Sequence, residues 1–273
     1  MSKDSSKSPA ETVEGGESVK PKLGRIPLVP WNPWLGIIFI VLIFYISQFV
    51  CGILISIYPL LKHWTTDQAN TWLDNSVLAQ FIYVLLAEAF TIAAIWGFLR
   101  LYKQRFSLIG LVKPRWRDLG FGLLGAVIYY ALYIIVVIPV VTHFIPSLNI
   151  DQQQEIGFNN VHGFAQLFIT FVSLAIIPPI SEEIMVRGFL YSSWRKAVPK
   201  IAAIILTSVM FASAHLPEGG SAGPLYIAAV DTFTLSVVLI ALRERTGSLW
   251  ASTTTHVIKN SVAFVALFVI GVH

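Results

Sequence analysis

Charged residues are scarce in this chain of 273 residues, where Asp, Glu, Lys and Arg make up 12% of the total, against roughly 25% in a typical soluble domain. Hydrophobic residues account for 55%, and the mean hydropathy is +0.70. A soluble fold cannot bury so much apolar surface, so lipid must be the solvent for much of the chain. Positive charges that flank membrane spans account for the net charge of +4, and we expect no nucleic-acid partner.

Cysteine is almost absent, and the single Cys51 lies in an apolar run, so no internal disulfide can form. The N-terminal residues lack the apolar segment of a cleavable signal peptide. Their polar composition predicts a disordered tail over residues 1–28. Residues 29–273 are then the membrane domain.

Seven long apolar stretches follow the tail, each long enough or nearly so to cross about 30 Å of hydrocarbon as a helix. We expect an all-α, polytopic transmembrane bundle of about seven spans. Pro178 and Pro179 lie within the fourth span and predict a kink or break there, which would raise the count to eight. The expected spans cover residues 33–60, 76–101, 118–142, 164–194, 200–216, 224–243 and 247–271.

Lysine and arginine gather in alternate connections between these spans. They are frequent before the first span, between the second and third, between the fourth and fifth, and between the sixth and seventh, whereas the opposite connections hold only Lys62. Under the positive-inside rule this pattern predicts an N-terminus inside and the C-terminal His273 outside. The sequence has a bacterial style, so we expect the bacterial cell membrane.

Ionisable side chains within apolar spans are costly and are functional candidates by default. Their depth follows from the helical rise of 1.5 Å per residue, counted from the nearest inner-edge basic residue. Glu182, His215 and His256 then lie about 20, 22 and 17 Å deep, so three helices bring a carboxylate and two imidazoles to one layer. Glu88 and Asp231 reach about 18 Å and are second-rank cavity candidates.

Local spacing separates the roles of the two neighbouring acids. Glu183 and Arg187 are four residues apart with the acid first, the favourable order for an ion pair on one helix. Glu182 is left without a cation on its own helix, which suits a general base. A single intramembrane histidine is usually a helix–helix hydrogen bond and a single Glu–Arg pair is usually structural, but a three-helix constellation is harder to explain as structure.

Two patterns of soluble enzymes occur in unsuitable contexts. A GxGxxG match at residues 120–125 lies in an expected span, where glycines favour close helix packing. A GxSxG match at residues 219–223 lies in a connection and lacks the strand–turn–helix context of a nucleophile elbow. The HExxH pattern of zincins is absent.

Three short motifs follow one another on successive expected spans. Residues 182–187 fit EExxxR, residues 211–215 fit FxxxH from Phe211 to His215, and residues 256–260 fit HxxxN from His256 to Asn260. In this order they resemble the CPBP family of intramembrane proteases, which includes the CAAX prenyl endopeptidases and bacteriocin-processing relatives. The resemblance covers about residues 160–265, the expected protease-like core.

The resemblance implies hydrolysis of a peptide bond within the membrane. It implies that Glu182 activates water with the help of His215, and that His256 and Asn260 stabilise the oxyanion. Glu183 and Arg187, with Phe211, would support the site. The resemblance favours a metal-free mechanism, but zinc held by Glu182, His215 and His256 is chemically sensible and stays open.

The expected substrate is a membrane-embedded or lipidated protein or peptide, and the expected environment is the lipid bilayer. Two other classes remain as alternatives. Intramembrane acids and histidines also form proton relays in transporters and ion pathways, where paired broken helices are typical. A non-catalytic membrane scaffold that binds a partner protein would keep the same fold.

Overall fold

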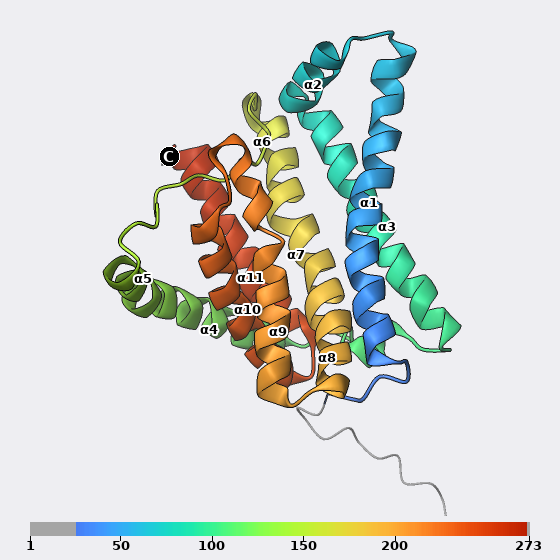
Figure 1. Cartoon of the computed structure of the whole chain (residues 1–273), viewed down its shortest axis with the longest axis vertical. Coiled ribbons are helices and arrows are strands. Elements are labelled where there is room, and N and C mark those ends of the chain that lie inside the picture. Colours follow the sequence, from blue (N-terminus) through green and yellow to red (C-terminus); the bar gives the residue numbers. More distant parts are fainter. Residues whose placement is uncertain (1–25, 272–273) are drawn as a thin grey trace, which may run out of the picture.

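A computed structural model describes residues 26–271 of the chain, and all its regular elements there are helices (Figure 1). The predicted disordered tail falls mostly on residues 1–25, and the predicted outer position of the C-terminus falls on His273. Both lie outside the described residues. The elements are α1 (Pro33–Leu61), α2 (Thr66–Asn75), α3 (Val77–Leu101), η1 (Phe106–Ile109), α4 (Trp116–Leu132), η2 (Tyr133–Val137), α5 (Ile138–Phe144), α6 (Gly163–Phe171), η3 (Val172–Ile176), α7 (Ile177–Glu182), η4 (Glu183–Leu190), α8 (Tyr191–Ala197), α9 (Lys200–Ser213), η5 (Leu216–Ala222), α10 (Tyr226–Thr246), α11 (Leu249–Phe264) and η6 (Val265–Ile270).

Seven helices within the described part are long and apolar enough to cross a membrane, as the sequence predicts. Four of them combine several elements, because short π-helical or 3-10 turns continue the same rod. The spans are Pro33–Leu61, Val77–Leu101, Trp116–Phe144, Gly163–Ala197, Lys200–Ala222, Tyr226–Thr246 and Leu249–Ile270. The chain is therefore an integral, multi-pass membrane protein with an all-α fold.

The short helix α2 was not expected from hydropathy, because it is polar and connects the first two spans. Thr65 caps it by accepting a hydrogen bond from the Gln68 backbone, and the Gln68 side chain accepts from the Thr65 backbone in return. This reciprocal pair is a capping box, which satisfies two N–H groups that a helix start leaves open. The Thr65-to-Gln68 spacing is thus the sequence signal of α2.

Of the kink or break predicted at Pro178 and Pro179, the break does not occur, because one helix runs from Gly163 to Ala197 (Figure 1) and the number of spans stays at seven. The rod instead passes through π-helical turns on both sides of the proline pair, at η3 and η4. Ile176, just before α7, has a φ of −116°, away from the regular helix. The wider turns absorb the missing N–H groups and the bulk of the proline rings, so the helix continues.

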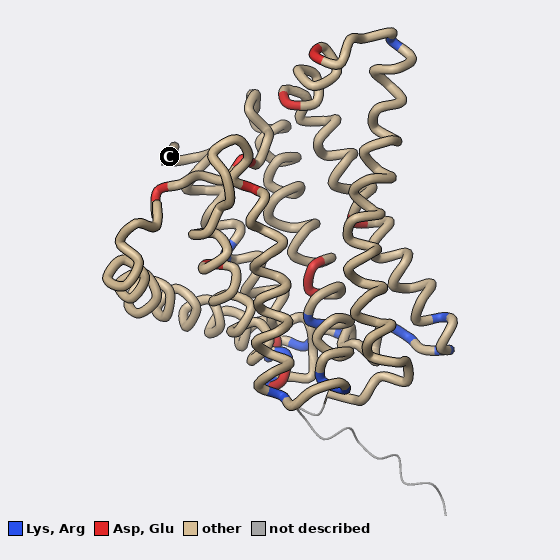
Figure 2. Tube along the Cα trace, in the orientation of Figure 1, with Lys and Arg blue, Asp and Glu red and all other residues tan. Residues whose placement is uncertain are grey.

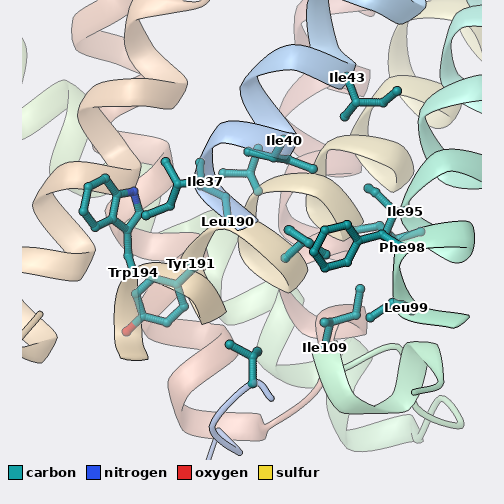
Figure 3. Close-up of a cluster of buried hydrophobic side chains, with 14 of the residues drawn as sticks. Ile37, Ile40, Ile43, Ile95, Phe98, Leu99, Ile109, Leu190, Tyr191 and Trp194 are labelled. Carbon is teal, nitrogen blue, oxygen red and sulfur yellow. The ribbon is translucent and has the colours of Figure 1, made fainter. Parts of the chain in front are cut away.

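The main hydrophobic core joins α1 and α3 to the fourth span. Figure 3 shows Ile37 and Ile40 of α1 beside Leu190, with Phe98 and Leu99 of α3 packed nearby. Trp31 is fully buried in the same cluster and stacks on Phe189, with the ring centroids 4.8 Å apart. This packing fixes the helix that carries Glu182 and Glu183 against the first two spans.

The helix α11 packs closely on α4 through two glycines of the GxGxxG match. A Cβ atom at Gly122 would lie 2.4 Å from the Thr254 Cβ, and one at Gly125 would lie 2.6 Å from the Thr255 Oγ1. The predicted close packing is confirmed at these two positions, whereas Gly120 has no neighbour within 4 Å. The GxSxG match lies in η5 and its C-cap Gly223, at the end of the fifth span, and so lacks the strand–turn–helix context of a nucleophile elbow.

Basic residues gather at one end of the bundle, where α3 and α8 end and α9 begins (Figure 2). Lys62 lies at the opposite end, near the acidic residues of α2. Arg195 and Lys200 at the basic end both contact Glu244, at 3.0 and 2.9 Å. The distribution is the one on which the predicted orientation, with the basic end inside, depends.

Candidate active site

Glu182 and Glu183 are adjacent on the fourth span, and both face His256 of α11. The Nε2 atom of His256 lies 3.6 Å from the Oε2 atom of Glu182, and its Nδ1 atom lies 3.2 Å from the Oε1 atom of Glu183. His256 and Glu183 are buried, whereas the Glu182 side chain is 22% exposed. The predicted approach of Glu182 and His256 from separate spans is therefore what the structure shows, and Glu182 is the more exposed of the two acids.

Glu183 and Arg187 form the ion pair that their spacing predicts. The Nη1 atom of Arg187 lies 3.1 Å from the Oε1 atom of Glu183, and both side chains are completely buried. The guanidinium also lies over the Phe211 ring, 4.1 Å from its centroid, which is a cation–π contact. Among residues 26–271, the guanidinium nitrogens of Arg187 form no hydrogen bond of good geometry. The buried charge is therefore stabilised by attraction to Glu183 and by the face of the Phe211 ring.

Phe211 packs against Arg187 and against both histidines, His215 and His256. Its ring centroid is 4.9 Å from that of His215 and 6.1 Å from that of His256, with edge-to-face packing in both cases. The Phe211 carbonyl oxygen also lies 2.8 Å from the Nδ1 atom of His215. A carbonyl can only accept, so Nδ1 of His215 carries the proton, and Nε2 of the neutral ring is free to accept one.

The hydrogen-bond partner of His256 likewise determines which of its ring nitrogens carries the proton. The Glu183 carboxylate, paired with Arg187, can only accept a hydrogen bond, so Nδ1 of His256 is the donor to it. The neutral ring then has an unprotonated Nε2 facing Glu182. His256 can donate from Nε2 to a developing oxyanion only as an imidazolium, which the two flanking carboxylates would stabilise.

Asn260 lies one helical turn beyond His256 and is held from another span. Its Nδ2 atom donates to the Leu174 carbonyl oxygen at 3.2 Å. Asn260 and Leu174 line a cavity of about 280 Å³ together with Lys259 and two glutamines of the connection between α5 and α6. Among the described residues, Asn260 thus connects α11 to η3. Its position relative to Glu182 is set by His256, which lies on the same helix, α11, and faces Glu182.

A second cavity, of about 230 Å³, reaches Glu182 and His215 from the side of the bundle. Its walls come from α1, the fourth span and α9, and they are mainly apolar. Glu218 of η5 is a further acid at this cavity, and its carboxylate accepts a hydrogen bond from the Gln154 side chain at 2.8 Å. The apolar wall includes Ile40, Val41, Phe44, Met185, Val186 and Met210.

The two second-rank acids differ in their surroundings. Asp231 of α10 forms an ion pair with Lys259 of α11 at 2.9 Å and accepts a hydrogen bond from the Tyr129 hydroxyl. Glu88 of α3 is half-buried and forms none of the ion pairs seen among the described residues. Asp231 is thus paired on α11, whereas Glu88 lies close enough to Glu182 for the two carboxylates to interact electrostatically.

Sequence reasoning missed Glu218 and Tyr129. Glu218 lies three residues after His215 on the 3-10 turn η5, so its spacing could have placed it beside the histidine. Tyr129 follows a glycine-containing segment of α4, and only the packing of α4 on α10 and α11 brings its hydroxyl to Asp231. No sequence signal indicates that contact.

The zinc alternative requires Glu182, His215 and His256 to converge on one point. Within residues 26–271, no group of three His, Cys, Asp or Glu side chains is arranged so that it could hold a metal ion. The donor types suit zinc, but their arrangement as seen here does not fit it.

Comparison with known protein families bears on the segment that holds all three motifs. A family model described as type II CAAX prenyl endopeptidase Rce1-like matches residues 164–262. This segment is Rce1-like. The resemblance of the motifs to the CPBP family is thereby confirmed for just over a third of the chain, from α6 to α11.

At the level of the family, this segment is similar to CAAX-type intramembrane proteases. No curated protein and no solved structure matches the chain significantly. The site described above lies almost entirely in the Rce1-like segment, and only α1 contributes cavity walls from outside it.

Proposed function

We propose that the chain is an intramembrane endopeptidase in which Glu182, assisted by His215, activates water against a peptide bond of a membrane-associated substrate. The observation that carries the proposal is the position of Glu182. It is the accessible acid of a buried cluster, and it stands with His215 at the end of an apolar cavity within the membrane span.

The proposed first step is attack of water on the substrate carbonyl carbon. Glu182 takes one proton of the water as the new carbon–oxygen bond forms, and the free Nε2 of His215 helps to hold the water. The carbonyl oxygen becomes an oxyanion. Its stabilisation falls to Nε2 of His256, as imidazolium, and to the N–H of Asn260 that Leu174 leaves free.

The proposed second step is collapse of the tetrahedral intermediate. The carbon–nitrogen bond breaks, and the proton held by Glu182 passes to the leaving amine, so the side chains return to their starting state. Glu183 and Arg187 take no part in proton transfer in this scheme. They fix the orientation of His256 through the Glu183 carboxylate.

The lateral cavity supports a substrate that reaches the site from lipid. Its walls on α1 and α9 are mainly apolar, and its polar side chains are those of Tyr45, Glu182, Ser213, His215 and Glu218. An apolar peptide segment or a lipid-modified peptide would lose little by entering it, because it leaves an equally apolar environment. We propose an orientation with the basic end inside, in a bacterial cell membrane.

The two alternatives lack a comparable observation. Transporter folds of this kind use paired broken helices, whereas the proline pair here leaves its span unbroken. A scaffold would not require an accessible acid between two histidines. Neither alternative is therefore favoured.

A peptide-cleavage assay tests the proposal. Purified protein in detergent is incubated with two fluorescence-quenched peptides, one with a prenylated cysteine near its C-terminus and one unmodified and apolar. We expect the wild-type protein to cleave at least one of them and Glu182→Gln to cleave neither. Asp67→Asn, which neutralises an exposed acid of α2 away from the site, is the control and should keep activity. Cleavage by Glu182→Gln at the wild-type rate would overturn the assignment.

A further inference from the structure

The carbonyl oxygen of Leu174 has no hydrogen-bond donor available in its own helix. In an α-helix its donor would be the N–H four residues later, and in a π turn the N–H five residues later. These positions are Pro178 and Pro179, and neither has an N–H. The residue three positions later, Ile177, donates its N–H to the Val172 carbonyl instead.

A backbone carbonyl at this depth needs a partner, because lipid supplies none. Asn260 of α11 is that partner, with its Nδ2 atom 3.2 Å from the Leu174 oxygen. An asparagine amide has two N–H donors and one acceptor. One N–H therefore anchors the side chain to Leu174, and the other donor is left for a substrate oxygen.

We propose that Pro178 and Pro179 are positioning residues, which hold Asn260 in place by keeping the Leu174 carbonyl free of intrahelical donors. The role rests on the proposed function only in its consequence, which is the orientation of an oxyanion donor. The hydrogen bond itself is a structural matter. Both prolines lie within a helix that continues from Gly163 to Ala197 (Figure 1), so ending a helix does not account for them.

This role requires that an N–H of the fourth span can compete with the Asn260 amide of α11 for the Leu174 carbonyl oxygen. Pro178→Ala adds an N–H at the α-helical position, and that N–H can bond to the Leu174 oxygen. Asn260 then loses its anchor, although the helix gains a hydrogen bond. Activity should fall while thermal stability stays equal or rises, which is the opposite of what damage to a structural residue produces.

A double-mutant cycle on thermal stability tests the hydrogen bond without any substrate. In the wild-type background, Asn260→Ala leaves the Leu174 carbonyl unpaired and should lower Tm by about 2–4 °C. In the Pro178→Ala background the same change should lower Tm by less than half as much. An equal loss in both backgrounds would show that the new N–H does not replace Asn260, and the inference would be wrong.

Cleavage kinetics test the consequence for catalysis. With a peptide that the wild-type protein cleaves, Pro178→Ala should lower kcat about 10-fold or more and leave KM within about 2-fold, since the anchored amide acts on the transition state. Pro59→Ala is the matched control, because Pro59 also lies inside a membrane helix, α1, away from the site. It should keep kcat.

The two experiments separate the failure of this inference from that of the proposed function. Full kcat in Pro178→Ala would overturn the positioning role even if Asn260 is essential. If the wild-type protein cleaves no peptide, the proposed function fails, whereas the Tm cycle still decides whether the prolines hold Asn260.

Discussion

The buried pair of Glu183 and Arg187 allows a quantitative prediction about stability. The side chains are completely buried, and their charged atoms are 3.1 Å apart. Removal of one partner from such a pair leaves an uncompensated charge and typically costs about 3–5 kcal/mol. We therefore expect Glu183→Ala and Arg187→Ala each to lower the free energy of unfolding by about 3–5 kcal/mol.

The two single variants should differ in stability, because the groups that surround Glu183 and Arg187 differ. Glu183→Ala leaves Arg187 with only the Phe211 ring, 4.1 Å away, and a more distant Glu182. Arg187→Ala leaves Glu183 with His256, whose Nδ1 atom is 3.2 Å away. Glu183→Ala should therefore be the more destabilised variant.

The assay is denaturant unfolding in detergent micelles, with expression level as a second readout. The double variant Glu183→Gln/Arg187→Met removes both charges at similar volume and should recover much of the loss, because the remaining groups are neutral. Lys200→Ala is the control: it breaks an ion pair with Glu244, but Lys200 is half exposed and the expected cost is at most about 1 kcal/mol. Wild-type stability in both single variants, or a double variant less stable than either, would refute the reasoning.

Three further predictions concern activity. Glu182→Ala and His215→Ala should each abolish peptide cleavage while melting and expression stay near normal; a variant with most of its activity intact would remove that residue from the catalytic assignment. Strong chelation should leave activity unchanged, and elemental analysis of active protein should find no stoichiometric metal, whereas about one zinc per chain with activity that follows occupancy would make Glu182 a ligand. Asp231→Asn should lower kcat by up to about 100-fold, because the ion pair with Lys259 fixes α11 beside His256 and a 1 Å displacement can cost that much; a kcat equal to that of wild type would limit Asp231 to a role in folding.

Hydropathy was enough to predict the seven spans, because each is a run of apolar residues long enough for the bilayer. It could not predict α2, whose stability comes from capping at Thr65 rather than from burial. The proline pair predicted a kink or a break, and the helix distorts locally without breaking. Sequence rules treat a missing N–H as a loss for the helix, whereas here π turns and a side chain of another span compensate for it.

The candidate site was predictable where helical periodicity decides the contact. The pairing of Glu183 with Arg187 follows from the turn of one helix, and the shared depth of Glu182 and His256 follows from the helical rise counted along their two separate spans. The contact of Asn260 with Leu174, the cation–π contact of Arg187 with Phe211, and the Tyr129–Asp231 bond depend on how separate helices rotate against each other. No motif in a single sequence encodes those rotations.

The most direct test of the central claim identifies the cleaved bond in cells. Membranes from cells that produce the wild-type protein or the Glu182→Ala variant at equal levels are compared by mass spectrometry of new peptide termini. We predict at least one membrane-associated protein or peptide whose uncut form accumulates with the variant and whose new terminus appears only with the wild-type protein. Identical termini in both membranes would contradict the claim that Glu182 activates water for proteolysis.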